Sequence, residues 1–232
     1  KYLLFFFNKD IIMLVHLGMT GKFFFVNRKR TKYKTSFYYD INEDKDKKHD
    51  RIIFDLSNNQ KLIYNDVRKF GFIKVEKTEK LLQSSHFKKL GPEPLSKKFD
   101  FKYFKNFIKK RKIGLKDLLM NQNFVAGLGN IYVNEAIFLS KINPRIKAYK
   151  ITNKKITDLI KNIKKLLKKA IEEGGSSIRD FNNADGQEGN FQQFFNVYGR
   201  KGELCRRLKC KGKIKIIRIS NRSTFYCDKC QK

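Results

Sequence analysis

Four cysteines stand close together near the end of the sequence, and no other cysteine occurs in it. A pair with four intervening residues is followed, after an insert of hairpin length, by a pair with two, so four thiolates can occupy the corners of a tetrahedron. Nothing in the sequence resembles a secretion signal, and the cysteines therefore indicate metal ligands rather than disulfides. The sequence predicts one structural Zn²⁺ bound by Cys205, Cys210, Cys227 and Cys230.

A glycine-rich turn, Gly127-Leu128-Gly129-Asn130, comes directly before a predicted helix. Glycine lets the backbone come close to a ligand, and the start of a helix offers free N–H groups and a positive dipole end to a phosphate. A turn that only packs two helices together would have the same composition. The motif alone therefore gives a weak prediction of a phosphate site.

Arg68 and Phe70 lie two residues apart after a predicted strand, where their side chains could project together. An exposed aromatic ring can wedge between base pairs while an arginine bonds to a base edge. Periodicity favours a different interpretation, in which Phe70 belongs to the hydrophobic core. Met19, in the segment 16–21, has the same ambiguity.

The net charge is strongly positive. Lys and Arg number 53 against 22 Asp and Glu, a formal charge of +31. Such a surplus favours a polyanionic partner, because each neutralised phosphate releases counterions. Nucleotide bias in the genome explains part of the lysine excess, yet the acidic residues have not risen with it. Nucleic acid is the favoured partner and an anionic membrane surface is the second choice; no apolar run is long enough to span a membrane.

The insert between the cysteine pairs carries basic residues at its predicted hairpin turn: Arg218 and Arg222, with Asn221 between them. Side chains of this kind at the tip of a zinc hairpin suit contact with phosphates. A turn that is merely solvated fits the spacing equally well, so the sequence leaves both interpretations open.

Short apolar runs separated by turn signals predict antiparallel β-structure up to about residue 78, as a sandwich or barrel. The runs are Tyr2–Phe7, Ile11–Val15, Lys22–Val26, Ser36–Tyr39, Arg51–Leu56, Lys61–Tyr64 and Phe72–Val75. After 91–94 the pattern becomes helical, with the longest helix predicted from about 153 to 173 and ended by two glycines. Residues 180–200 indicate a loop, and Ile214–Ile219 and Ser223–Tyr226 indicate two further strands.

Nine motifs, in order along the chain, resemble the formamidopyrimidine-DNA glycosylases, the bacterial 8-oxoguanine repair enzymes related to endonuclease VIII. They are Lys1–Leu4, HLGMTG at 16–21, KHD at 48–50, YNDVRKFG at 64–71, LGPEPLS at 90–96, GLGNIYVNE at 127–135, EEGGSSIRDF at 172–181, VYGRKGE at 197–203 and RSTFYCDKCQ at 222–231. The resemblance implies an α+β fold in three parts. Residues 1–95 would be the incomplete remainder of an N-terminal antiparallel β-sandwich, 96–199 a helix-two-turn-helix domain, and 200–232 a C-terminal zinc finger β-hairpin with four cysteine ligands.

The resemblance also implies roles for single residues. Met19, Arg68 and Phe70 would fill the gap left by a flipped nucleotide, and Asn130 with Arg222 would clamp the phosphates around the lesion. Lys1 would contact that phosphate and assist β-elimination, while Arg222 would donate a proton in δ-elimination. Further DNA contacts would come from His49 and Lys112, or Arg111 if the alignment shifts by one. Residues 180–189 would close on the flipped base.

The sequence departs from the family pattern at Val67, where a proline is usual, at Lys69, and in the wide first cysteine pair. The family nucleophile is an N-terminal proline with a glutamate beside it as the acid, and no residue of 1–232 matches either. We therefore expect this chain alone to bind damaged DNA poorly and to excise no base. With both residues supplied, the resemblance predicts a bifunctional DNA glycosylase and AP lyase.

The expected substrate is double-stranded DNA that carries an oxidised purine or an abasic site, bound by a monomer in the bacterial cytoplasm at the nucleoid. Three alternatives remain. One is an endonuclease VIII-like enzyme for oxidised pyrimidines, which the Met-Arg-Phe set and the long loop before 197 disfavour. Another is a non-catalytic DNA-binding remnant. A zinc-ribbon scaffold for RNA or protein would fit the charge and cysteines but would leave the nine motifs unexplained.

Overall fold

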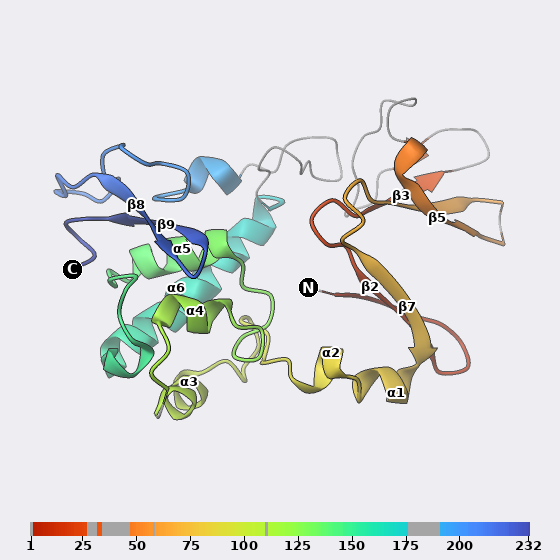
Figure 1. Ribbon diagram of the computed structural model, residues 1–232, viewed down its shortest axis with the longest axis horizontal. Helices are drawn as coiled ribbons and strands as arrows, with labels where there is room; N and C mark the ends of the chain where they lie inside the picture. The colour runs from red at the N-terminus through yellow and green to blue at the C-terminus, as the bar shows by residue number, and fades with distance from the viewer. Residues whose placement is uncertain (1, 27–31, 34–46, 58, 110, 176–190) are drawn as a thin grey trace. The chain divides into compact units, whose positions relative to one another are not determined.

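The computed structural model describes residues 2–26, 32–33, 47–57, 59–109, 111–175 and 191–232 (Figure 1). The chain divides into two compact units, and both are discontinuous in sequence. The first unit comprises Lys1–Lys88 and Glu173–Gln192, and the second comprises Lys89–Glu172 and Gln193–Lys232. The first holds two β-sheets, and the second holds the longer helices and a C-terminal hairpin.

Two antiparallel sheets form the first unit. A three-stranded sheet has the order β1-β2-β7, and a four-stranded sheet has the order β4-β3-β6-β5. In the first sheet Met13 of β2 lies opposite both Phe5 of β1 and Val75 of β7. The strands are β1 (Leu3–Phe6), β2 (Ile11–His16), β3 (Lys22–Val26), β4 (Lys32–Tyr33), β5 (Asp50–Asp55), β6 (Lys61–Asn65) and β7 (Phe72–Lys77).

The core of this unit explains why β2 is apolar at successive positions. Met13 and Val15 pack with Phe23 and Tyr64 of the other sheet. The intervening residues of β2 face the opposite side, where they pack against Leu81 of α1 (Thr78–Leu82). A strand buried on both faces shows a continuous apolar run instead of an alternating one. The predicted β-sandwich is thus confirmed, and α1 and α2 (Ser85–Lys88) are additions that the sequence did not predict.

The central helix of the second unit is α5 (Asn130–Leu139), which is buried along most of its length. It packs against α4 (Leu115–Met120), α6 (Asn153–Glu172) and β9 (Arg222–Cys227). Apolar residues at helical spacing on α6, from Ile156 to Ala170, are buried, whereas Ile171 near its end is 67% exposed. Helix α3 (Phe101–Ile108) is capped by Asp100, whose carboxylate accepts the Tyr103 N–H at 2.7 Å.

The C-terminal hairpin pairs β8 (Ile214–Ile219) with β9, and it lies beside α5 in Figure 1. Ser220 and Asn221 form its turn, with φ values of 47° and 60°. Arg222 lies opposite Ile219 at the start of β9, so it is a strand residue and not part of the turn. The hairpin joins the core of the second unit, because Ile214 and Cys227 pack with Phe138 of α5.

The remaining short elements are the 3-10 helices η1 (Lys47–His49), η2 (Ala148–Lys150) and η3 (Phe191–Phe194). Two predictions, the strand at Ser36–Tyr39 and the lesion loop at 180–189, lie outside the described residues. Within the part of the chain that the structure describes, no helix is both long enough and apolar enough to cross a membrane.

Candidate metal centre and nucleic-acid interface

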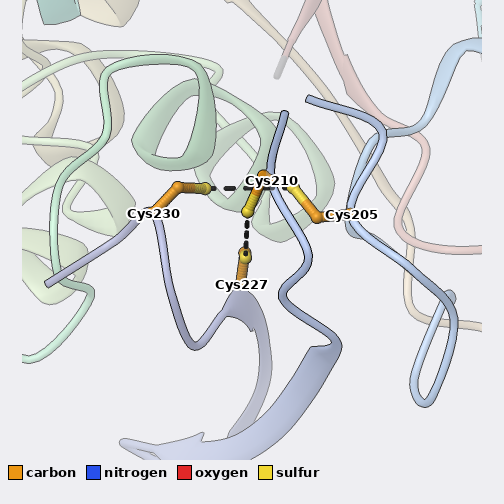
Figure 2. A group of neighbouring side chains, drawn as sticks. All are labelled: Cys205, Cys210, Cys227 and Cys230. Atoms are coloured by element: carbon orange, nitrogen blue, oxygen red, sulfur yellow. Dashed lines mark hydrogen bonds between the residues drawn. The ribbon is translucent and has the colours of Figure 1, made fainter. Parts of the chain in front are cut away.

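The four cysteine side chains point toward one another (Figure 2). All four sulfur atoms lie within 4.8 Å of each other. Cys205 Sγ is 3.9 Å from Cys230 Sγ, and Cys210 Sγ is 3.6 Å from Cys227 Sγ. A disulfide needs about 2.05 Å, whereas four sulfurs at about 2.3 Å from a zinc ion are separated by about 3.8 Å. The geometry therefore fits a tetrahedral metal site.

The chemistry of the four donors also fits zinc. Four sulfur ligands with no oxygen or nitrogen suit a soft tetrahedral ion and not Mg²⁺ or Ca²⁺. Burial raises the pKa of the Cys205 thiol and, more strongly, that of Cys230. A bound cation would favour the thiolate form of these two ligands at neutral pH. All four positions are protein ligands, so the ion would hold the hairpin together and leave no coordination position for a substrate.

Met19, Arg68 and Phe70, here called the surface trio, lie together on two neighbouring turns of the first unit. Met19 is 54% exposed and Phe70 is 56% exposed. Arg68 links them, because its Nη1 lies 3.3 Å from Met19 Sδ and its guanidinium carbon lies 4.6 Å from the centre of the Phe70 ring. The expectation from periodicity that Phe70 is a core residue is wrong. Lys69 has a φ of 56°, so the chain turns there and the alternation of a strand ends.

Two glycines allow the turns that carry the surface trio to come into contact. We name these the first turn (17–21) and the second turn (66–71). A Cβ at Gly18, whose φ is +63°, would lie 2.7 Å from the carbonyl carbon of Phe70. A Cβ at Gly71 would collide with the Tyr64 hydroxyl. A larger residue at Gly18 would force the turns apart, and one at Gly71 would displace the Tyr64 side chain.

Asn130 and Arg222 are close neighbours in the second unit. Asn130 is the first residue of α5, and its Nδ2 donates to the carbonyl oxygen of Ser223 at 3.0 Å. Arg222 is the preceding residue of β9 and is exposed. An exposed arginine thus adjoins the residue that contacts the start of α5, where free N–H groups and the helix dipole favour an anion. This arrangement can bind a phosphate.

The other residues of the predicted interface belong to neither group, although His49 is bonded to the second turn. His49 belongs to the first unit, where its carbonyl accepts the Asp66 N–H at 3.0 Å and its Nδ1 lies 3.4 Å from Nη2 of Arg51. Arg111 donates to the Phe107 carbonyl and stacks on that ring at 4.1 Å, whereas Lys112 is exposed. Lys1 lies outside the described residues.

Comparison with known proteins identifies the family. Family models for the formamidopyrimidine-DNA glycosylase N-terminal domain and H2TH domain match residues 1–73 and 90–182. A formamidopyrimidine-DNA glycosylase of Rickettsia africae is 42% identical over 231 residues, which cover 100% of this chain and 78% of the relative. The formamidopyrimidine-DNA glycosylase of Roseobacter denitrificans is 40% identical, and the match covers 100% of this chain and 80% of that relative. The chain belongs to the formamidopyrimidine-DNA glycosylase family.

Solved structures of the family share the fold of this chain. A Lactococcus lactis FPG mutant, in complex with DNA containing Fapy-dG, superposes with a TM-score of 0.84 at 35% identity and covers 100% of this chain and 79% of that one. The Lactococcus lactis Fpg in complex with DNA containing an abasic site gives a TM-score of 0.83 at 36% identity, with the same coverage. The similarity extends over both units and the cysteine hairpin.

Three buried residues that the sequence analysis did not single out connect neighbouring elements of the fold. Lys116 of α4 is 1% exposed and donates to the Ser223 carbonyl at 3.0 Å and to the Thr224 hydroxyl at 2.6 Å. Asp66 and Glu135 are buried carboxylates with several donors each. The available sequence signals were a lysine on the otherwise apolar face of Leu115–Leu119 and acidic residues inside two of the motifs.

The buried lysine predicts a pH dependence of stability. Burial lowers the pKa of Lys116 to about 8, whereas an unfolded chain has an ordinary lysine pKa of about 10.4. Between pH 8 and 10.4 the lysine is protonated in the unfolded state but largely neutral in the folded state. The free energy of unfolding therefore rises as the pH rises through this range, and it falls again as the pH returns to 8. Between pH 8 and 10.4 we expect the free energy of unfolding of wild type to rise by about 2–3 kcal/mol relative to that of Lys116→Met. Denaturant unfolding of both proteins measures this, and parallel pH profiles would contradict it.

Proposed function

We propose that this protein is a DNA glycosylase that removes oxidised purines such as 8-oxoguanine and formamidopyrimidines from double-stranded DNA. After base removal, the same enzyme would cleave the abasic site by β,δ-elimination. The relatives are named formamidopyrimidine-DNA glycosylases, and the similar solved structures contain DNA with Fapy-dG or an abasic site. The excess of positive charge supports a nucleic-acid substrate.

The surface trio is the observation that carries this proposal. An enzyme that acts on a base inside a duplex must extrude the nucleotide, and the resulting gap in the stack costs energy unless side chains fill it. A thioether, a guanidinium and an aromatic ring presented together on two turns are suited to that gap. Phe70 and Met19 are more than half exposed although both are apolar, which a purely structural role does not explain.

Further roles follow the family pattern. Asn130 and Arg222 would bind the phosphates around the lesion, with Arg222 as the proton donor of δ-elimination. Lys1 would assist β-elimination, and His49 with Lys112 or Arg111 would contact DNA. One zinc ion on the four cysteines would keep β9, and hence Arg222, in position. We further propose that 1–95, 96–199 and 200–232 act as the catalytic sandwich, the DNA-binding helices and the zinc finger.

Trapping with borohydride tests the activity. In the family pattern a proline amine attacks C1′ of the flipped nucleotide, the base leaves, and a Schiff base forms that borohydride reduces to a stable adduct. Residues 1–232, and the same chain with whatever segment its gene encodes before Lys1, would each be incubated with a duplex that pairs 8-oxoguanine with cytosine. We expect strand cleavage and an adduct only from a protein that includes the proline.

Substrate controls separate the alternatives. A duplex with an oxidised pyrimidine in place of 8-oxoguanine tests the endonuclease VIII-like alternative, and an undamaged duplex tests non-specific binding. Preferential cleavage of the oxidised pyrimidine would replace the purine proposal. If zinc-loaded, folded protein cleaved neither duplex and bound both equally, a non-catalytic DNA-binding role would be the better conclusion.

A further inference from the structure

The buried carboxylate of Asp66 connects the two turns that carry the surface trio. Asp66 is 1% exposed. Its Oδ1 accepts a hydrogen bond of 2.6 Å from the hydroxyl of Thr20 in the first turn. Its Oδ2 accepts from the N–H of Gly71 at 2.9 Å and from the hydroxyl of Tyr64 at 3.2 Å. One side chain is thus bonded to both turns and to the last part of β6.

The hydroxyl of Thr20 extends this connection to the surface trio itself. It donates to Asp66 and at the same time accepts the backbone N–H of Arg68 at 3.1 Å. Thr20 directly follows Met19, and Gly71 directly follows Phe70. Every member of the trio is therefore within one residue of a group bonded to Asp66 or Thr20.

The charge on Asp66 strengthens these bonds. Burial by itself raises the pKa of Asp66, but the hydrogen bonds from Thr20, Gly71 and Tyr64 outweigh it, and the pKa lies below its ordinary value. Burial, with the nearby charge of Asp66, raises the pKa of Tyr64, whose hydroxyl remains a donor. Hydrogen bonds to an ionised acceptor are about twice as strong as bonds between neutral groups.

We propose that Asp66 is a positioning residue, which holds the surface trio in the arrangement that enters the gap left by a flipped nucleotide. The proposal rests on the proposed function of the trio. Side chains already fixed in the inserting arrangement lose little conformational freedom on insertion, whereas side chains on two unlinked turns lose more. Loss of the carboxylate should therefore weaken insertion at a damaged site while contact with intact DNA remains.

The test follows insertion without requiring chemistry, and it uses the protein with whatever segment its gene encodes before Lys1, as in the trapping experiment. A duplex carries a stable abasic-site analogue with 2-aminopurine as the opposite base, and the fluorescence of that base rises when insertion unstacks it. The variants are Asp66→Asn, Thr20→Val and, as a conservative change that keeps the hydroxyl, Thr20→Ser. Asp55→Asn is the matched control, because Asp55 is exposed on β5 and pairs with Lys61 at 3.4 Å, away from both turns. Zinc content and thermal unfolding establish that each protein is folded.

We expect Asp66→Asn and Thr20→Val to lower the preference for abasic over intact duplex by about tenfold and to suppress the fluorescence rise. Thr20→Ser and Asp55→Asn should behave like wild type, and binding to intact duplex should change little in all variants. A normal fluorescence rise in folded Asp66→Asn or Thr20→Val would overturn the inference about Asp66 but would leave the proposed role of the surface trio intact. The absence of a rise and of a preference in wild type would overturn the proposed role of the trio and this inference with it. If Asp66→Asn fails to fold, the comparison of Thr20→Val with Thr20→Ser decides.

Discussion

Purified protein is expected to contain one zinc ion, and removal of the zinc is expected to unfold the β8–β9 hairpin. Cys205 and Cys227 belong to the core cluster of the hairpin together with Ile214, so loss of the metal leaves buried thiols without a cation and opens that cluster. Structural zinc sites of this kind bind with about 10–16 kcal/mol, which is comparable to the roughly 5–15 kcal/mol that stabilises a whole domain. DNA affinity should fall by about a hundredfold, since Arg222 and the acceptor of Asn130 both lie on β9.

Metal analysis, hydrogen exchange and DNA binding, each before and after a strong chelator, measure these effects. Cys227→Ser should reproduce them without a chelator because Cys227 is completely buried. Leu208→Ala is the matched control, since Leu208 lies between the first two cysteines and is 93% exposed. Zinc-free protein with unchanged hydrogen exchange in residues 214–227 would rule out a structural role for the metal.

Glu135→Ala should be the most damaging single substitution in the second unit that leaves the cysteines intact. Glu135 is fully buried on α5. Its carboxylate accepts four hydrogen bonds of 2.9–3.0 Å, from the backbone N–H groups of Asn196, Val197 and Tyr198 and from the side-chain amide of Asn196. These residues lead into the cysteine hairpin. Unsatisfied buried donors cost about 1–3 kcal/mol each, so we expect a loss of about 4 kcal/mol or more.

Urea unfolding of the variants measures this loss. Glu135→Gln keeps one of the two acceptor oxygens but turns an NH2 group toward backbone donors, and it should lose about half as much. Glu203→Gln is the control, because Glu203 is an exposed partner of Arg200 and should change stability by less than about 1 kcal/mol. A cost below about 1 kcal/mol for Glu135→Ala would show that water replaces the carboxylate.

Those parts of the fold that depend on local patterns could be predicted from the sequence. β3 has the predicted bounds, Lys22–Val26, and α6 ends one residue before the predicted 173. Periodicity over a strand or a long helix depends only on residues close together in the sequence, so it can be recognised without knowing the tertiary contacts. Helices α1 and α2 are too short to show a period of 3.6 residues, so they could not be found in this way.

The supports of the candidate site could not be predicted, because their partners are distant in sequence. Thr20 and Asp66 are 46 residues apart, Glu135 and Asn196 are 61 apart, and Lys116 and Thr224 are 108 apart. No local spacing relates such residues, and a buried lysine looks the same in the sequence as the many exposed ones. The cysteines were predictable for the opposite reason, because each pair is local and only the distance between the pairs is long.

The second unit is built from two separate segments of the chain, and this limits when it can fold during synthesis. During translation the strands of the first unit emerge before any helix of the second unit. The second unit lacks the hairpin that packs against Phe138 of α5 until the cysteines have emerged. Its helices therefore cannot complete their core when α6 has been made, and must wait for the last segment of the unit, Gln193–Lys232.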